Sequence, residues 1–249
     1  MLKVESLSVG YGEREVLKEL NIEFKKGFIY SILGPNGSGK STFLRVIDKI
    51  LKPNNGTIYL NGKSIKSFSA SQISKIIAYL PQRIDILPFC KVLDAVFLGR
   101  KPHISFEPTS FDLEIVLETI NKFGLSKFAF RNINELSGGE FQKVLIARAF
   151  AQKPEVLLLD EPVNHLDPKN QIEILKLIRK LTKDNNILTI IVLHDINLAI
   201  QFSDYFVLMK NGRIFKFGDL TVIDSDTIKE VYEIDVEILE YNGRKLVLF

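Results

Sequence analysis

A segment near the amino terminus has the residue types and spacing of a phosphate-binding loop, and it consists of Gly34, Pro35, Asn36, Gly37, Ser38, Gly39, Lys40, Ser41 and Thr42. It fits the pattern G-x-x-x-x-G-K-[ST] at every fixed position, and an apolar run at 28–33 leads into it. Glycines let a backbone approach phosphate oxygens, and N–H groups at the start of the following helix attract anions. Lys40 can reach the β- and γ-phosphates, and the Ser41 hydroxyl can hold Mg²⁺. The segment predicts a nucleoside triphosphate site, in which we expect Lys40 to be an exposed loop charge whose main partner is phosphate.

Two adjacent acids form a second candidate group. Asp160 lies at the end of an apolar run at 156–159, which is typical of a buried strand. An acid at the carboxyl end of such a strand can hold Mg²⁺ directly or through water. Glu161 follows and points elsewhere, so it can polarise an attacking water. Many strands end in an acid, so the pair predicts a metal and water site only together with the phosphate-binding loop in the same chain.

A third candidate is the LSGGE segment at 136–140. Ser137 and Glu140 have the spacing of a capping box, which predicts the start of a helix that we expect to run to Ala151. Gly138 and Gly139 are poor helix formers. They leave bare backbone N–H groups at the start of this helix, however, and so predict a second anion site in the chain.

The hydrophobic pattern places these groups on an alternating series of strands and helices. The strands expected from it lie at 2–9, 16–24, 28–33, 57–60, 76–80, 156–160, 188–193, 205–209 and 213–217. A helix is expected after Pro168. Between about 84 and 152 the pattern is helical, and we expect an inserted helical subdomain there within one domain spanning 1–249. The tail at about 224–249 is expected to hold a short helix and a hairpin turned at Asn242 and Gly243.

Composition and charge exclude several kinds of protein. There are 33 basic and 30 acidic residues, a net charge of +3, and because they are dispersed we expect no nucleic-acid partner. The apolar runs fall short of the ~20 residues that span a bilayer, and Glu5 stands where a signal peptide would have its apolar core. The lone Cys90 excludes an internal disulfide. We expect no zinc site, because metal-ligand spacing is lacking among His103, His165 and His194.

With the phosphate-binding loop, the LSGGE segment and the two acids in this order, the chain resembles the ATP-binding-cassette (ABC) ATPases over nearly all of its 249 residues. The resemblance implies an α/β fold of the P-loop NTPase type, with a RecA-like core, an antiparallel β subdomain and an inserted helical subdomain. It also implies hydrolysis of ATP to ADP and phosphate, coupled to transmembrane transport.

The resemblance assigns roles around the phosphates. Glu161 matches the catalytic glutamate, and His194 matches the switch histidine that contacts the γ-phosphate. Gln82 matches the Q-loop residue that touches both Mg²⁺ and the attacking water. The metal ligands implied in this way are Ser41, Gln82 and Asp160.

The same resemblance implies that two copies pair head to tail as a homodimer in the ATP-bound state. Tyr11 would stack on adenine, a contact worth about 1–3 kcal/mol, and Val16 would lie at the nucleotide as well. The ATP held by one copy would meet residues of the other, namely Ser137, Gly138, Gly139, Glu140 and Asp167.

The segments at 79–82 and 92–100 resemble those of ATPase subunits of iron-siderophore, haem and cobalamin importers. This implies that the surface from Ile84 to Lys101 contacts an integral membrane permease and, through it, an extracytoplasmic substrate-binding protein. The chain would then sit peripherally on the cytoplasmic face of the cell membrane. The same apolar residues fit a simple buried helix. The alternative function is an ABC ATPase outside transport, for example in iron–sulfur cluster assembly, whereas a regulator without turnover is opposed by the presence of Glu161 and His194.

Overall fold

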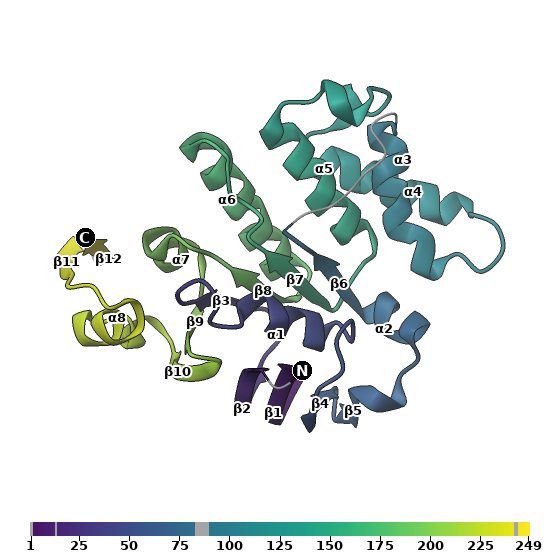
Figure 1. Cartoon of the computed structure of the whole chain (residues 1–249). Coiled ribbons are helices and arrows are strands. Elements are labelled where there is room, and N and C mark those ends of the chain that lie inside the picture. The colour runs from purple at the N-terminus through teal and green to yellow at the C-terminus, as the bar shows by residue number, and fades with distance from the viewer. Residues whose placement is uncertain (1, 13, 83–89, 242–243) are drawn as a thin grey trace.

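The structure is a computed structural model that describes residues 2–12, 14–82, 90–241 and 244–249. Two sheets form its centre and helices pack around them, while a small hairpin at the carboxyl terminus lies at one edge (Figure 1). The strand and helix positions predicted from the hydrophobic pattern are confirmed to within two residues. The turn predicted at Asn242 and Gly243 lies outside the described residues.

The larger sheet has the strand order β10-β9-β3-β8-β7-β6. Neighbours run parallel from β9 to β6, and only the edge strand β10 is antiparallel to its neighbour. Every residue of β3, β7 and β8 is buried, as expected for strands covered on both faces. The bounds of the six strands are β3 Ile29–Leu33, β6 Ile77–Leu80, β7 Val156–Asp160, β8 Leu188–Val192, β9 Tyr205–Lys210 and β10 Arg213–Gly218.

Alternate residues of β7 show how both faces of this sheet are buried. Leu157 and Leu159 belong to a core cluster shared with helices α5 and α6. Val156 and Leu158 belong to a second cluster shared with α1 and the smaller sheet. That antiparallel sheet has the order β2-β1-β4-β5, with bounds β1 Leu2–Tyr11, β2 Arg14–Phe24, β4 Asn55–Leu60 and β5 Lys63–Ser64.

The helices are α1 Lys40–Ile47, α2 Ala70–Ile76, α3 Val92–Phe97, α4 Ser110–Lys122, α5 Gly138–Ala151, α6 Pro168–Asp184, α7 Ile196–Phe202 and α8 Ser225–Tyr232. Helices α3, α4 and α5 contact one another and form a group beyond the β6 side of the larger sheet (Figure 1). They lie in the range expected to be a helical subdomain. Helix α2, which begins with a capping box of Ser69 and Gln72, was not among the predicted elements.

The carboxyl-terminal hairpin pairs β11 Glu237–Tyr241 with β12 Arg244–Leu248. It is attached to α7, where the Asn197 side chain donates a 3.0 Å hydrogen bond to the Val247 carbonyl and accepts one of 2.8 Å from the Val247 N–H. In the part of the chain that the structure describes, no helix has the length and apolar character needed to cross a bilayer.

Candidate functional site

The phosphate-binding loop connects β3 to α1, as the sequence pattern predicts. Gly34 has φ 147°, and a Cβ placed on it would lie 2.1 Å from the Met209 carbonyl oxygen, so only glycine fits there. Gly39 precedes α1 with φ 101° and gives the helix no side-chain cap. The first backbone N–H groups of α1 therefore face the loop without a capping side chain, as an anion site requires. Asn36 and Gly37 are exposed at the tip, and Thr42 is half-buried.

The structure corrects one expectation about this loop. Lys40 is not an exposed loop charge but the first residue of α1, and it is only 5% exposed. Its Nζ turns back and donates to the carbonyl oxygens of Gly34 at 2.8 Å and Pro35 at 2.9 Å. Burial lowers the pKa of this ammonium group. The Ser38 hydroxyl is also buried, and it has no hydrogen-bond partner among the described residues, which leaves a polar atom in the loop for a ligand to satisfy.

Asp160 ends β7 and is 1% exposed. Its Oδ1 accepts a hydrogen bond from the Ser41 hydroxyl at 3.0 Å, and its Oδ2 accepts one from the Tyr79 hydroxyl at 3.2 Å. Burial raises the pKa of this carboxyl group, because the charged form has lost its hydration. A desolvated carboxylate beside a serine hydroxyl fits Mg²⁺, which binds oxygen ligands.

Glu161 follows with φ 54°, a left-handed conformation that is uncommon outside glycine and often occurs at functional sites. The side chains of Glu161 and Asp160 contact different residues. Gln82 Nε2 donates a 2.5 Å hydrogen bond to Glu161 Oε2. The other carboxylate oxygen, Oε1, lies 2.6 Å from His194 Nε2. Asn164 Nδ2 donates to Oε2 as well. The three residues expected to act on water, Gln82, Glu161 and His194, are thus brought together.

The LSGGE segment folds as its capping pattern predicts. Ser137 caps α5, and its backbone N–H donates to Glu140 Oε2 at 2.9 Å. These hydrogen bonds lower the pKa of the Glu140 carboxyl. Gly138 is exposed, whereas a Cβ on Gly139 would lie 2.5 Å from the Asn170 side chain. Across the described part of the chain, the hydrogen bonds of the Ser137 and Glu140 side chains go to each other and not to the phosphate-binding loop.

Three further residues were expected at the nucleotide, and the structure describes the surroundings of two of them. Asp167 caps α6 by accepting a 3.0 Å hydrogen bond from the Asn170 N–H. The Val16 carbonyl oxygen lies beside the loop, 3.2 Å from the position of a Cβ on Gly39. The Tyr11 side chain lies outside the described part of the chain, so the contact with adenine stays a prediction.

Sequence reasoning did not assign Tyr79 or Asn164 to either acid. Tyr79 lies on β6, opposite Leu158 of β7, and a hydroxyl in an otherwise apolar strand was the available signal. Burial raises the Tyr79 pKa to about 12, so its hydroxyl remains protonated and can donate. Asn164 carried no such signal, because its contact depends on the turn that follows Glu161.

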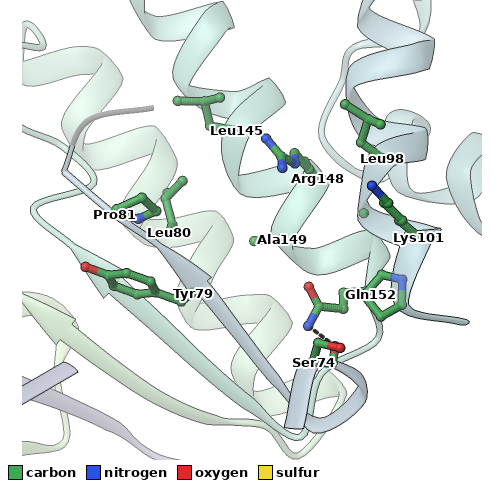
Figure 2. Close-up of a pocket in the computed structure, with 12 residues that line it drawn as sticks. Ser74, Tyr79, Leu80, Pro81, Leu98, Lys101, Leu145, Arg148, Ala149 and Gln152 are labelled. Atoms are coloured by element: carbon green, nitrogen blue, oxygen red, sulfur yellow. Dashed lines mark hydrogen bonds between the residues drawn. The ribbon is translucent and has the colours of Figure 1, made fainter. Parts of the chain in front are cut away.

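A groove lies next to this site, between the end of β6 and α5; we call it the β6–α5 groove. Figure 2 shows Leu80 and Pro81 on one side, with Leu98, Lys101 and Arg148 on the other. Its lining is mixed apolar and basic, and consists of Ser74, Tyr79, Leu80, Pro81, Leu98, Gly99, Lys101, Pro102, Leu145, Arg148, Ala149 and Gln152. Of the surface expected to meet a membrane protein, Leu98, Gly99 and Lys101 contribute to this groove, and 84–89 lie outside the described residues.

Comparison with known proteins gives consistent matches. The family described as ABC transporter matches residues 17–164. The iron(3+)-hydroxamate import ATP-binding protein of Bacillus subtilis is 41% identical over 241 residues, which cover 96% of this chain and 90% of that protein.

Solved structures with a similar fold include the following two. One is a metal-chelate type ABC transporter in an inward-facing conformation, with a TM-score of 0.86, 30% identity, and coverage of 100% of this chain and 96% of the other. The second is a dimeric ATP-binding cassette in a post-hydrolysis state with ADP and phosphate. Its TM-score is 0.77 at 30% identity, and the match covers 88% of this chain and 99% of the cassette.

Proposed function

This chain belongs to the ABC transporter family of ATP-binding proteins, and on that basis we propose that it is the ATPase subunit of an importer for metal chelates of the iron-siderophore, haem or cobalamin type. Family membership itself makes the chain an ABC ATPase that couples ATP hydrolysis to transport. The import direction and the substrate class are supported by the named hydroxamate import relative and by the metal-chelate transporter structure.

The observation that carries the ATPase assignment is that the adjacent acids Asp160 and Glu161 have different hydrogen-bond partners. Asp160 is bonded to Ser41, and Glu161 is bonded to Gln82 and His194. We assign Ser41, Asp160 and Gln82 to Mg²⁺, which supplies positive charge to the phosphates when bound. Lys40 and the N–H groups of the loop hold the phosphates.

Hydrolysis requires a water whose proton is accepted as it attacks phosphorus. We assign this task to Glu161, because Asp160 is assigned to Mg²⁺ and is only 1% exposed. Gln82 and His194 both contact Glu161 and therefore fix where its oxygens point. His194 is 35% exposed, so it remains accessible to a γ-phosphate.

The second anion site is assigned to a second copy of the chain. Ser137, Gly138, Gly139 and Glu140 have no hydrogen bond to their own phosphate-binding loop in the described residues. An ATP-bound homodimer would place these residues and Asp167 at the partner's nucleotide. A dimeric cassette with ADP and phosphate is among the similar structures, which supports this arrangement.

The β6–α5 groove is assigned to an integral membrane permease. It begins directly before Gln82 and is walled by α5, the helix that Ser137 caps. A segment bound in the groove would contact the end of β6, which precedes Gln82 and its hydrogen bond to Glu161. It would also contact α5, which begins within the LSGGE segment. We therefore propose a peripheral location at the cytoplasmic face of the membrane and an indirect link to an extracytoplasmic substrate-binding protein. We also propose that the chain is a single domain spanning 1–249, with an inserted helical subdomain at about 84–152.

Cross-linking tests the transporter assignment. A single cysteine at Leu98 or Lys101, in a Cys90→Ser background, should be captured by an integral membrane protein when the chain is cross-linked in native membranes. Both residues line the groove. The matched control is a cysteine at Glu237, which is exposed on the terminal hairpin and should give no such product. Capture of soluble proteins alone would contradict the permease assignment and favour the alternative of an ABC ATPase outside transport, such as one of iron–sulfur assembly.

The substrate class has its own test. The captured permease complex, reconstituted in liposomes with its binding protein, should take up a ferric siderophore, haem or cobalamin in an ATP-dependent manner. The control substrate is maltose, for which no uptake is expected. Uptake of maltose but of none of the three chelates would leave the ATPase assignment intact and overturn the proposed substrate class.

A further inference from the structure

We propose that Tyr79 is a positioning residue, which holds the Asp160 carboxylate in place for Mg²⁺ and joins it to the wall of the β6–α5 groove. The inference rests on the proposed ATPase site, because Asp160 is assigned there to the metal. Tyr79 is not itself proposed to touch Mg²⁺ or nucleotide.

The first argument is the way Asp160 is bonded. Ser41 donates to Oδ1 at 3.0 Å and Tyr79 donates to Oδ2 at 3.2 Å, so each carboxylate oxygen has a protein donor. Asp160 is 1% exposed, and water does not readily replace a donor lost at such a site. Without the Tyr79 hydroxyl, the carboxylate would keep its hydrogen bond from Ser41 and lose the second hydrogen bond that fixes its plane.

The second argument is the position of Tyr79 in the sheet. Strand β6 runs parallel to β7, with Tyr79 opposite Leu158. The segment that ends β6 therefore supports both acids at the end of β7. Tyr79 bonds Asp160, and Gln82 bonds Glu161. Arg45 of α1 also interacts with the Tyr79 hydroxyl, which ties this contact to the helix that carries Ser41.

The third argument is that Tyr79 belongs both to the wall of the β6–α5 groove and to the surroundings of Asp160. Its residue lines the β6–α5 groove together with Leu80 and Pro81, and Figure 2 shows its hydroxyl pointing away from the groove. Tyr79 is thus part of the groove wall as a residue, and its hydroxyl bonds the buried Asp160. A segment that packs against the groove would bear on the residue that orients the metal carboxylate.

The test uses Tyr79→Phe, which keeps the ring and removes the hydroxyl. In a Glu161→Gln background, where ATP is held without turnover, we measure the Mg²⁺ concentration that gives half-maximal dimer in size-exclusion chromatography with saturating ATP. Loss of a residue that orients a metal ligand typically weakens metal binding by about 10–100-fold, and we expect the midpoint to rise about 10-fold. Binding of a fluorescent ATP analogue in EDTA should be unchanged, which shows that the variant is folded. The control is Tyr205→Phe, at a ring that stacks on Tyr30 in the core.

A midpoint for Tyr79→Phe that equals or falls below that of the control would overturn the proposal. A second measurement does not need the dimer. Electron paramagnetic resonance of Mn²⁺ with the ATP-loaded chain should show about 10-fold weaker metal binding in Tyr79→Phe, and equal affinity would overturn the role. If the Glu161→Gln parent forms no dimer at any Mg²⁺ concentration, the two-copy site is wrong, and the Mn²⁺ measurement alone decides on Tyr79.

Discussion

Replacing Glu161 by glutamine is expected to slow ATP hydrolysis by ~10²–10⁴-fold, the usual cost of removing general-base assistance, while ATP stays bound. The amide keeps the size of the side chain and one oxygen to accept from Gln82 or His194. It loses the negative charge and the basicity that would polarise water. Asp160 and Ser41 remain bonded to each other, and Lys40 and the loop N–H groups are untouched.

The expected consequence is a trapped dimer. Removing a negative charge next to the γ-phosphate also reduces repulsion there, so intact ATP should accumulate between two copies. In size-exclusion chromatography with ATP and Mg²⁺ the variant should run as a stable dimer, and the wild type should return to monomer.

Asp160→Asn is the matched comparison. It also replaces a carboxylate with an amide, but at the residue assigned to Mg²⁺, so it should lose both turnover and most of the dimer. Near wild-type hydrolysis by Glu161→Gln would show that Glu161 is a strand-end carboxylate with no catalytic role.

Lys40→Ala is expected to weaken ATP binding by about 10–100-fold, because hydrogen bonds to charged groups contribute about 1.5–3 kcal/mol and each 1.4 kcal/mol is about tenfold in affinity. In the structure Nζ bridges the Gly34 and Pro35 carbonyl oxygens. The ammonium group therefore lies inside the loop before any ligand arrives, and it is already partly desolvated, which strengthens its interaction with an anion.

The measurement is titration with a fluorescent ATP analogue, alongside circular dichroism. Alanine is the best helix former, so α1 should persist and the spectrum should not change. The control is Lys52→Ala, at an exposed lysine just beyond α1, which should bind ATP as the wild type does. Equal ATP affinity and hydrolysis in Lys40→Ala and the control would contradict the assignment of Lys40 to phosphate.

The features predicted well from sequence are those fixed by short spacing. The loop at 34–42, the adjacent acids and the capping box of Ser137 and Glu140 each depend on residues within nine positions of one another. Local backbone geometry then determines the outcome. The buried strands could be predicted equally well, because short uninterrupted apolar runs are typical of strands that are covered on both faces.

The features that sequence could not supply depend on topology. Tyr79 meets Asp160 because β6 pairs with β7, although the whole helical segment lies between those strands in the chain. The burial of Lys40 depends on which way its side chain turns once α1 has formed. The attachment of Val247 to Asn197 likewise requires knowing that the terminal hairpin packs on α7.

Helix α5 is fixed at its carboxyl end and exposed at its amino end. Its carboxyl end is held where Gln152 donates to the Ile77 carbonyl at 2.6 Å and where Ala151 and Phe150 are buried, while its other end carries the exposed Gly138. Its 14 residues at about 1.5 Å each give an arm of about 21 Å. A tilt of about 10° about the Gln152 end displaces the Gly138 end by about 4 Å on an arm of that length. That displacement exceeds the length of a hydrogen bond, so a small rocking of α5 would make or break the contacts that we propose between its first N–H groups and a phosphate.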